Sequence, residues 1–194
     1  MPTRAIHLIS ARRMISSFWE DEIEMNLKKV NFPRQLEAAG LAEKIREALA
    51  ASTILLWQEG NLNVPLLRLS DPLAEALQRA RLQRRIRFGF EDIAGRLAAE
   101  KKGIDAVRQK MTSRQQNRVS RLLLFSSDGA DRLYRHIGQI LIEHQPRLLG
   151  CRLDVDGKAL GKLLGAGSAG IKVILAEHKD AVSDILRALV NGRE

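Results

Sequence analysis

Arginine and lysine side chains gather in the middle of the chain, where their chemistry is contact with a polyanion. The 194 residues carry a net charge of +9, and residues 66–121 hold 14 basic against 6 acidic side chains, whereas the flanking segments carry net charges of zero and +1. A local excess of this size attracts phosphate groups and releases their counterions. Arginine outnumbers lysine here, which favours forked hydrogen bonds to phosphate. The stretch predicts a nucleic-acid surface; the alternative is a solvated helix face.

Three arginines of this stretch are expected on one side of a helix. Arg81, Arg84 and Arg85 stand at i, i+3 and i+4, and this spacing places side chains together on a helical surface. The side chains expected to extend this positive surface are Lys101, Lys102 and Lys110. Aromatic residues make up only 4% of the chain, which favours structured RNA read through its backbone and shape over stacking of its bases.

A glycine-rich segment, Gly165–Gly170, matches the dinucleotide-binding pattern G-x-G-x-x-G. That pattern works when a strand precedes the glycines and a helix follows them, because the pyrophosphate sits on the helix N-terminus. Here the expected order is reversed, with a helix before the glycines and a strand after them. We therefore expect a connecting loop with Gly165 as a helix C-cap, whose bare glycines let a phosphate backbone approach, and no NAD, FAD or ATP.

A turn with serine and aspartate side chains, Ser126–Asp131, follows an expected buried strand. It lies where ligands usually bind in α/β sheets, so its side chains could hold a nucleotide, a metal or an RNA phosphate. The alternative is that Asp128 or Ser127 simply caps the next helix.

Catalytic and metal-binding patterns do not emerge from the other reactive residues. The four histidines and the single cysteine, Cys151, make no metal-ligand spacing, and the chain has no G-x-S-x-G elbow. The expectation is a protein with no catalytic residues, no metal and no small-molecule cofactor. One cysteine cannot form an internal disulfide, and the chain shows neither an apolar membrane span nor a signal peptide. We expect a cytoplasmic protein that does not bind membranes.

The elements that position these residues are clearest in the second half of the chain. Short apolar runs at Leu122–Ser126, Leu148–Leu153 and Ile171–Ala176 alternate with helical patterns, of which Asp131–His144 is the strongest. Strands that alternate with helices predict an α/β fold with a mostly parallel sheet between helices on both faces, a three-layer α/β/α domain over residues 91–194. The other helices expected there are Lys158–Leu164 and Asp180–Val190.

The first 90 residues are expected to form a smaller α+β region. Gln35–Ala51 looks helical, although Gly40 could divide it into two short helices. Thr53–Gln58 is expected as a buried strand. Asp71-Pro72 is expected to start a helix that runs to about Arg87.

Several segments of the second half follow the order of segments in a known family. They are Gly103–Gln109 (GIDAVRQ), Leu124–Ala130 (LFSSDGA), Ala159–Gly165 (ALGKLLG), Ile171–Ala176 (IKVILA) and a last helix from Asp180 to Leu189. Residues 97–190 in this way resemble the kink-turn-binding ribosomal protein superfamily, in particular its bacterial YlxQ-like branch. Asp105, Ala106 and Gln109 stand where that family has Asn, Glu and Lys. Pro72–Phe88 is also similar to the closing helix of YlxR-like domains.

The resemblance implies a non-enzymatic protein that binds kinked or looped RNA, related to the ribosome or translation. It maps the RNA contacts to Lys101–Lys110, Ser127–Ala130 and Gly165–Gly170. With the arginines above, the residues expected at the RNA are Arg81, Arg84, Arg85, Lys101, Lys102, Gly103, Asp105, Arg108, Lys110, Ser127, Asp128, Gly129, Gly167 and Ser168. The alternatives are a protein-interaction or scaffold module, and an enzyme that uses the Ser126–Asp131 turn.

Overall fold

The sheet of this protein has six strands, and its centre is parallel. The structure is a computed structural model that describes residues 27–110, 118–167 and 170–192. The strands are β1 (Thr53–Leu55), β2 (Asn63–Leu67), β3 (Ile86–Phe88), β4 (Arg121–Phe125), β5 (Leu148–Leu153) and β6 (Val173–Ala176), in the spatial order β1-β2-β5-β4-β6-β3. β2, β5 and β4 run parallel, and the other neighbours pair antiparallel.

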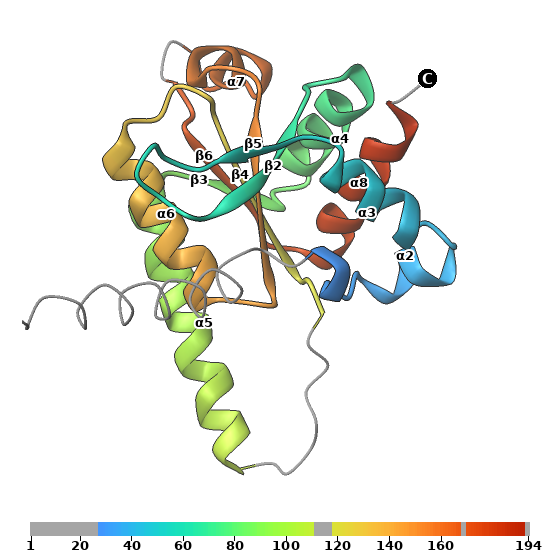
Figure 1. The fold of residues 1–194 in the computed structure, drawn as a ribbon, viewed down its shortest axis with the longest axis vertical. Helices are drawn as coiled ribbons and strands as arrows, with labels where there is room; N and C mark the ends of the chain where they lie inside the picture. The colour runs from blue at the N-terminus through green and yellow to red at the C-terminus, as the bar shows by residue number, and fades with distance from the viewer. Residues whose placement is uncertain (1–26, 111–117, 168–169, 193–194) are drawn as a thin grey trace, which may run out of the picture.

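Helices cover both faces of this sheet, which confirms the expected α/β/α fold (Figure 1). One face carries α2 (Arg34–Ala38), α3 (Ala42–Ala50), α4 (Asp71–Leu82) and α8 (Lys179–Asn191), with a 3-10 turn at Leu27–Lys29; the other carries α5 (Phe90–Lys110) and α6 (Asp131–Glu143). Along β4, Leu122 and Leu124 belong to the core under the first group, and Leu123 and Phe125 to the core under the second. This alternation gives a strand that is apolar on both faces.

The short helix α7 (Gly157–Leu163) lies at the edge of the sheet where the parallel strands end (Figure 1). It is seven residues long and does not run back along a face of the sheet. β6 therefore starts beside the end of β4, with Val173 opposite Phe125, and runs antiparallel to it. The three strands expected in the second half do share one sheet, because β4, β5 and β6 are neighbours.

The first half differs from the sequence-based expectation in several elements. The helix from Asp71 ends at Leu82 rather than near Arg87, and the edge strand β3 follows it. β2 was not expected, because Pro65 lies in its middle. The expected buried strand at Thr53–Gln58 is the three-residue edge strand β1, whose residues are at most half-buried. Gly40, with φ +68°, does divide the first helical segment into α2 and α3.

Residues before and after the expected domain boundary at residue 90 share both halves of the core. Phe32, Leu36 and Ile45 pack with Leu122 and Leu186 on one face of the sheet. On the other face, Leu56 and Val64 belong to the same cluster as Ile93 and Ile137.

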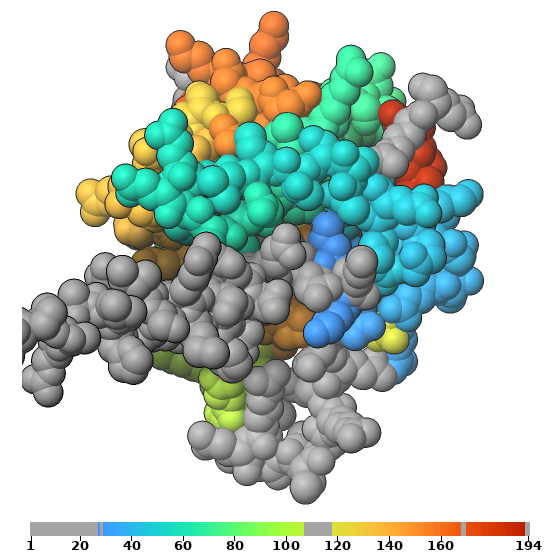
Figure 2. Space-filling view, viewed as in Figure 1, coloured from blue at the N-terminus to red at the C-terminus, as the bar shows by residue number. Residues whose placement is uncertain are grey.

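In the space-filling view the β1–β2 hairpin (teal) lies across the front of the molecule, below the orange α7 (Figure 2).

The long helix α5 extends past the edge of the sheet where β4 and β5 begin (Figure 1). Only Ile93 and Leu97, near its start, are fully buried apolar residues within its described side chains. Lys102, Gly103 and Ala106 are exposed. The second half of α5 thus projects from the body as a helical arm.

Candidate nucleic-acid interface

Acidic side chains from outside residues 66–121 fold back onto this basic stretch. The ion pairs are Arg118 with Glu37, Lys101 with Glu143, Arg87 and Arg96 with Glu177, and Arg85 with Asp180. These four acids offset half of the local charge excess of +8 that the sequence shows. The charge available to an anionic partner is therefore smaller, and concentrated at fewer side chains, than the sequence suggests.

The end of α4 presents two exposed arginines in different surroundings. The guanidinium carbon of Arg81 lies 4.8 Å from the ring centroid of Phe88, a cation–π contact across the turn that joins α4 to β3. Arg84 is exposed and has φ +54°. Because α4 ends at Leu82, the expected helical face of Arg81, Arg84 and Arg85 does not form: Arg85 instead points to Asp180, 3.7 Å away.

The next expected residues lie on the projecting half of α5. The Lys101 ammonium donates to the Glu143 carboxylate over 2.8 Å, a contact that lowers the pKa of Glu143. Lys102 and Gly103 are exposed, and Asp105 is half-buried beside a pocket. Arg108 and Lys110 belong to the last turns of the same helix.

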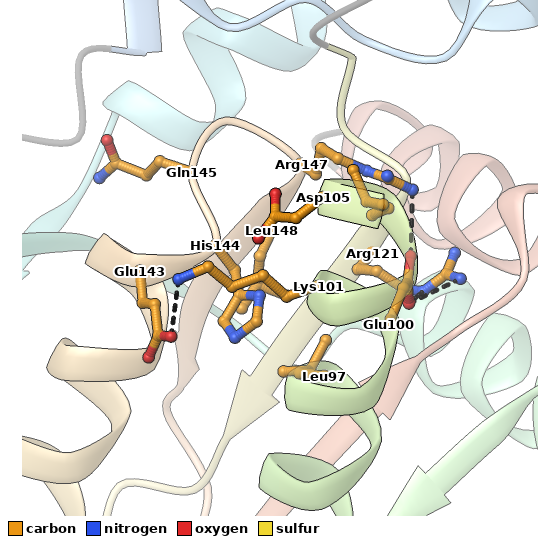
Figure 3. Close-up of a pocket in the computed structure, with 11 residues that line it drawn as sticks. Leu97, Glu100, Lys101, Asp105, Arg121, Glu143, His144, Gln145, Arg147 and Leu148 are labelled. Carbon is orange, nitrogen blue, oxygen red and sulfur yellow. Dashed lines mark hydrogen bonds and ion pairs between the residues drawn. The ribbon is translucent and has the colours of Figure 1, made fainter. Parts of the chain in front are cut away.

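That pocket lies at the edge where β4 and β5 begin, and Figure 3 shows its centre. The Glu100 carboxylate accepts one hydrogen bond from Arg121 and one from Arg147, each with a donor–acceptor distance of 3.0 Å. This side chain thus joins α5 to the starts of two strands. The pocket holds about 70 Å³, room for a few small molecules of the size of water. Burial lowers the pKa of His144, which also lines it. Each described cation that lines the pocket pairs with a carboxylate that also lines it, so the lining has little net charge.

The turn after β4 has a structural role that differs from helix capping. The first residue of α6 is preceded by Ala130, whose side chain makes no capping hydrogen bond. Asp128 instead accepts a hydrogen bond from the Gly157 peptide N–H at the start of α7 and pairs with Lys172. Partial burial is the largest single influence and would raise the pKa of Asp128, but the contacts with Lys172, Ser126 and the Gly157 N–H together outweigh it, and the pKa falls to about 2. The expected cap is thus a link between three loops.

Ser127 and Gly129 take part in the same turn through their backbones. The Ser127 N–H donates to the Val155 carbonyl, and its own carbonyl accepts from Arg152. The Gly129 N–H donates to the Tyr134 hydroxyl over 2.8 Å. These groups are already used within the fold.

The glycine segment lies between α7 and β6, in the order that the sequence predicts. Gly165 has φ +68°, and two hydrogen bonds close the end of α7: Gly165 N–H to Lys162 and Ala166 N–H to Gly161. This pair of bonds is the Schellman motif, so the expected C-cap is confirmed. Gly167 is exposed with φ +66°, whereas Ser168 lies outside the described residues.

The expected site residues fall into separate places. Asp128, Gly129 and Gly167 lie where the parallel strands end, whereas α5 passes the opposite edge, about 15 Å away along the five residues of β4. No sequence pattern indicates the Glu100 contacts, which join three distant segments. Phe88 and Phe90 are the two aromatic residues of the basic stretch, but nothing in the sequence indicates the contact of Phe88 with Arg81.

Comparisons with known proteins leave the resemblance untested: neither family models nor curated proteins match this chain. Within residues 27–110, 118–167 and 170–192, no helix is both long and apolar enough to span a membrane. The same described residues contain no cluster of three or more side chains suited to hold a metal ion.

Proposed function

We propose that this chain is a non-enzymatic protein that binds structured RNA, with its contacts centred on three cations. Between residues 79 and 121, Arg81, Arg84 and Lys102 are the described cations that are exposed and pair with no described acid. This observation carries the proposal, because only an uncompensated cation gains strongly from a phosphate. All three belong to the residues that the sequence predicts at the RNA.

The position of Lys102 adds support. It lies on the half of α5 that projects past the sheet (Figure 1), where residues 101–110 contain four basic side chains and one acidic side chain. A projecting basic helix can approach a folded RNA without steric conflict from the body of the protein. The resemblance to the kink-turn-binding superfamily favours a cytoplasmic RNA of the ribosome or of translation as the partner.

A salt titration with charge-matched variants tests the proposal. Each phosphate contact contributes about 0.7–0.9 to the slope of log affinity against log salt concentration. Replacing Arg81, Arg84 and Lys102 by Gln should therefore weaken binding to one structured RNA and flatten this slope by about 2. The control replaces Lys29, Arg34 and Lys44 by Gln, three exposed cations on the N-terminal helical turns.

The outcome depends on the difference between the two triple variants. Thermal melts of both should match the wild type, because exposed charges contribute little to stability. Equal slopes and equal affinities for the two variants would contradict the proposal.

The protein-interaction module remains the second candidate, favoured by Leu82, whose side chain is 82% exposed next to Arg81. A wild-type protein that retains no RNA at low salt would favour that candidate.

A further inference from the structure

We infer that the end of α4 binds an unpaired nucleobase, which stacks on the Arg81 guanidinium. This inference rests on the proposed RNA binding and names the class of RNA that the surface selects: RNA with unstacked bases in loops or bulges.

The guanidinium of Arg81 lies over the ring of Phe88. Phe88 belongs to the edge strand β3, where it is half-buried and pairs with Ile174 of β6. The ring is thus fixed by the sheet, and the guanidinium carbon lies 4.8 Å from its centroid. An arginine on such a ring loses less conformational freedom when a ligand binds than a free one would.

The other face of this guanidinium is open to a ligand. The Arg81 side chain is exposed, and no described carboxylate draws it away from the ring. Guanidinium groups are planar and weakly hydrated, and nucleobases stack on them in RNA complexes. The arrangement extends one aromatic ring into a two-layer platform at the surface.

The residues beside Arg81 offer contacts for the other parts of a nucleotide, its phosphate and its sugar. Arg84 supplies an exposed positive charge three residues on, within reach of a neighbouring phosphate. Leu82 is 82% exposed and offers apolar contact to a sugar or a base. A stacking cation, a second cation and an apolar side chain lie within four residues at the end of α4.

This platform selects bases that are not already stacked. In a continuous duplex each base is covered by its neighbours, so a protein reads mainly its backbone and shape. Loops and bulges expose base faces, and loss of the aromatic partner of one stacked base weakens binding about fivefold or more. The duplex and the loop would therefore differ in how strongly they depend on Arg81.

The test compares a hairpin RNA that has an unpaired adenine loop with a continuous duplex of equal phosphate number. Arg81→Lys keeps the charge but removes the planar group, and Arg79→Lys is the matched control on the same helix, where Arg79 faces Glu75. Arg81→Lys should weaken hairpin binding about fivefold or more, a larger loss than for the duplex, and it should leave the salt slope unchanged because the charge is kept. With 2-aminopurine in the loop, the wild type should quench the fluorescence and Arg81→Lys should not.

Phe88→Leu is a second variant that removes the ring but keeps the charge of Arg81, and a thermal melt checks that it folds. It should lose the hairpin preference as Arg81→Lys does. If the wild type binds both RNAs and Arg81→Lys changes neither, the inference is overturned while the proposed function stands. If the wild type binds neither RNA, the proposed function fails and this inference fails with it.

Discussion

Glu100 joins the second half of α5 to the sheet, and its replacement should weaken this attachment. Ile93 and Leu97 bury the first half of this helix, but none of its described side chains after Leu97 is fully buried. The Glu100 carboxylate is joined to Arg121 and Arg147, both at the starts of neighbouring strands. Glu100→Gln keeps the size of the side chain and removes its charge. We expect this change to lower the free energy of unfolding.

The structure sets the size of the loss. Removing one partner of a fully buried ion pair costs about 3–5 kcal/mol. Glu100 and Arg121 are each 19% exposed and Arg147 is 29% exposed, so solvent screens part of the interaction. A loss of about 2–3 kcal/mol is therefore expected, which in a chain of this size lowers the melting temperature by about 5–10 °C.

Urea denaturation at low and high salt measures this loss. Glu47→Gln is the control, because Glu47 is exposed on α3 and makes no ion pair with a described residue. A double-mutant cycle of Glu100→Gln with Arg121→Gln isolates the pair. The two changes together should cost less than the sum of the single losses by about 1 kcal/mol or more. A loss below about 0.5 kcal/mol for Glu100→Gln, typical of an exposed ion pair, would refute the reasoning.

Three further changes test the packing, the pH response and the backbone. Burial lowers the pKa of His144 below its unfolded value near 6.5, so the free energy of unfolding should fall as the pH drops below about 6.5. Urea titrations at several pH values should show a smaller fall for His144→Asn. Gly150→Ala places a methyl group 2.5 Å from the buried Leu141 side chain, and denaturation should show a loss of about 1–3 kcal/mol. Arg84→Gly removes the steric cost of a positive φ but also makes the unfolded chain more flexible, and the net rise in the free energy of unfolding should be up to about 1 kcal/mol. The same change should weaken RNA binding.

The second half of the fold could be predicted because its signals are local. Leu122–Phe125 is a continuous apolar run and Leu148–Leu153 is apolar except for Arg152, so both need cover on both faces, and α6 carries a regular apolar stripe. α5 escaped prediction because Ile93 and Leu97 give an apolar stripe of little more than one turn. β2 escaped because a proline inside a strand argues against one. Its register with β5, where Leu67 lies opposite Leu153, depends on a contact across more than eighty residues.

The site was predicted as a list of residue types and not as an arrangement. The sequence shows which residues are cations, but it cannot show that Glu37, Glu143, Glu177 and Asp180 return to them from other segments. Ion pairing of this kind is set by the tertiary fold alone. Asp128 illustrates the same limit, because a capping role follows from its place before a helix, whereas its partners Gly157 and Lys172 come from other loops.

Among the helices that the structure describes, α2, α4 and α7 end in the same hydrogen-bonded motif, and the exception among these three lies in the proposed interface. α2 and α7 end with Gly40 and Gly165, both near φ +68°, whereas α4 ends with Arg84 at φ +54° and the same two hydrogen bonds, Arg84 N–H to Arg81 and Arg85 N–H to Ala80. Glycine is the residue that adopts this conformation at no steric cost, and any other side chain costs about 1–2 kcal/mol there. Backbone strain of this size persists where function needs the side chain. Arg84 is exposed and makes no ion pair with a described acid, so no ion pair within the described residues offsets this cost. The proposed contact of its charge with an RNA phosphate would account for an arginine at a glycine position.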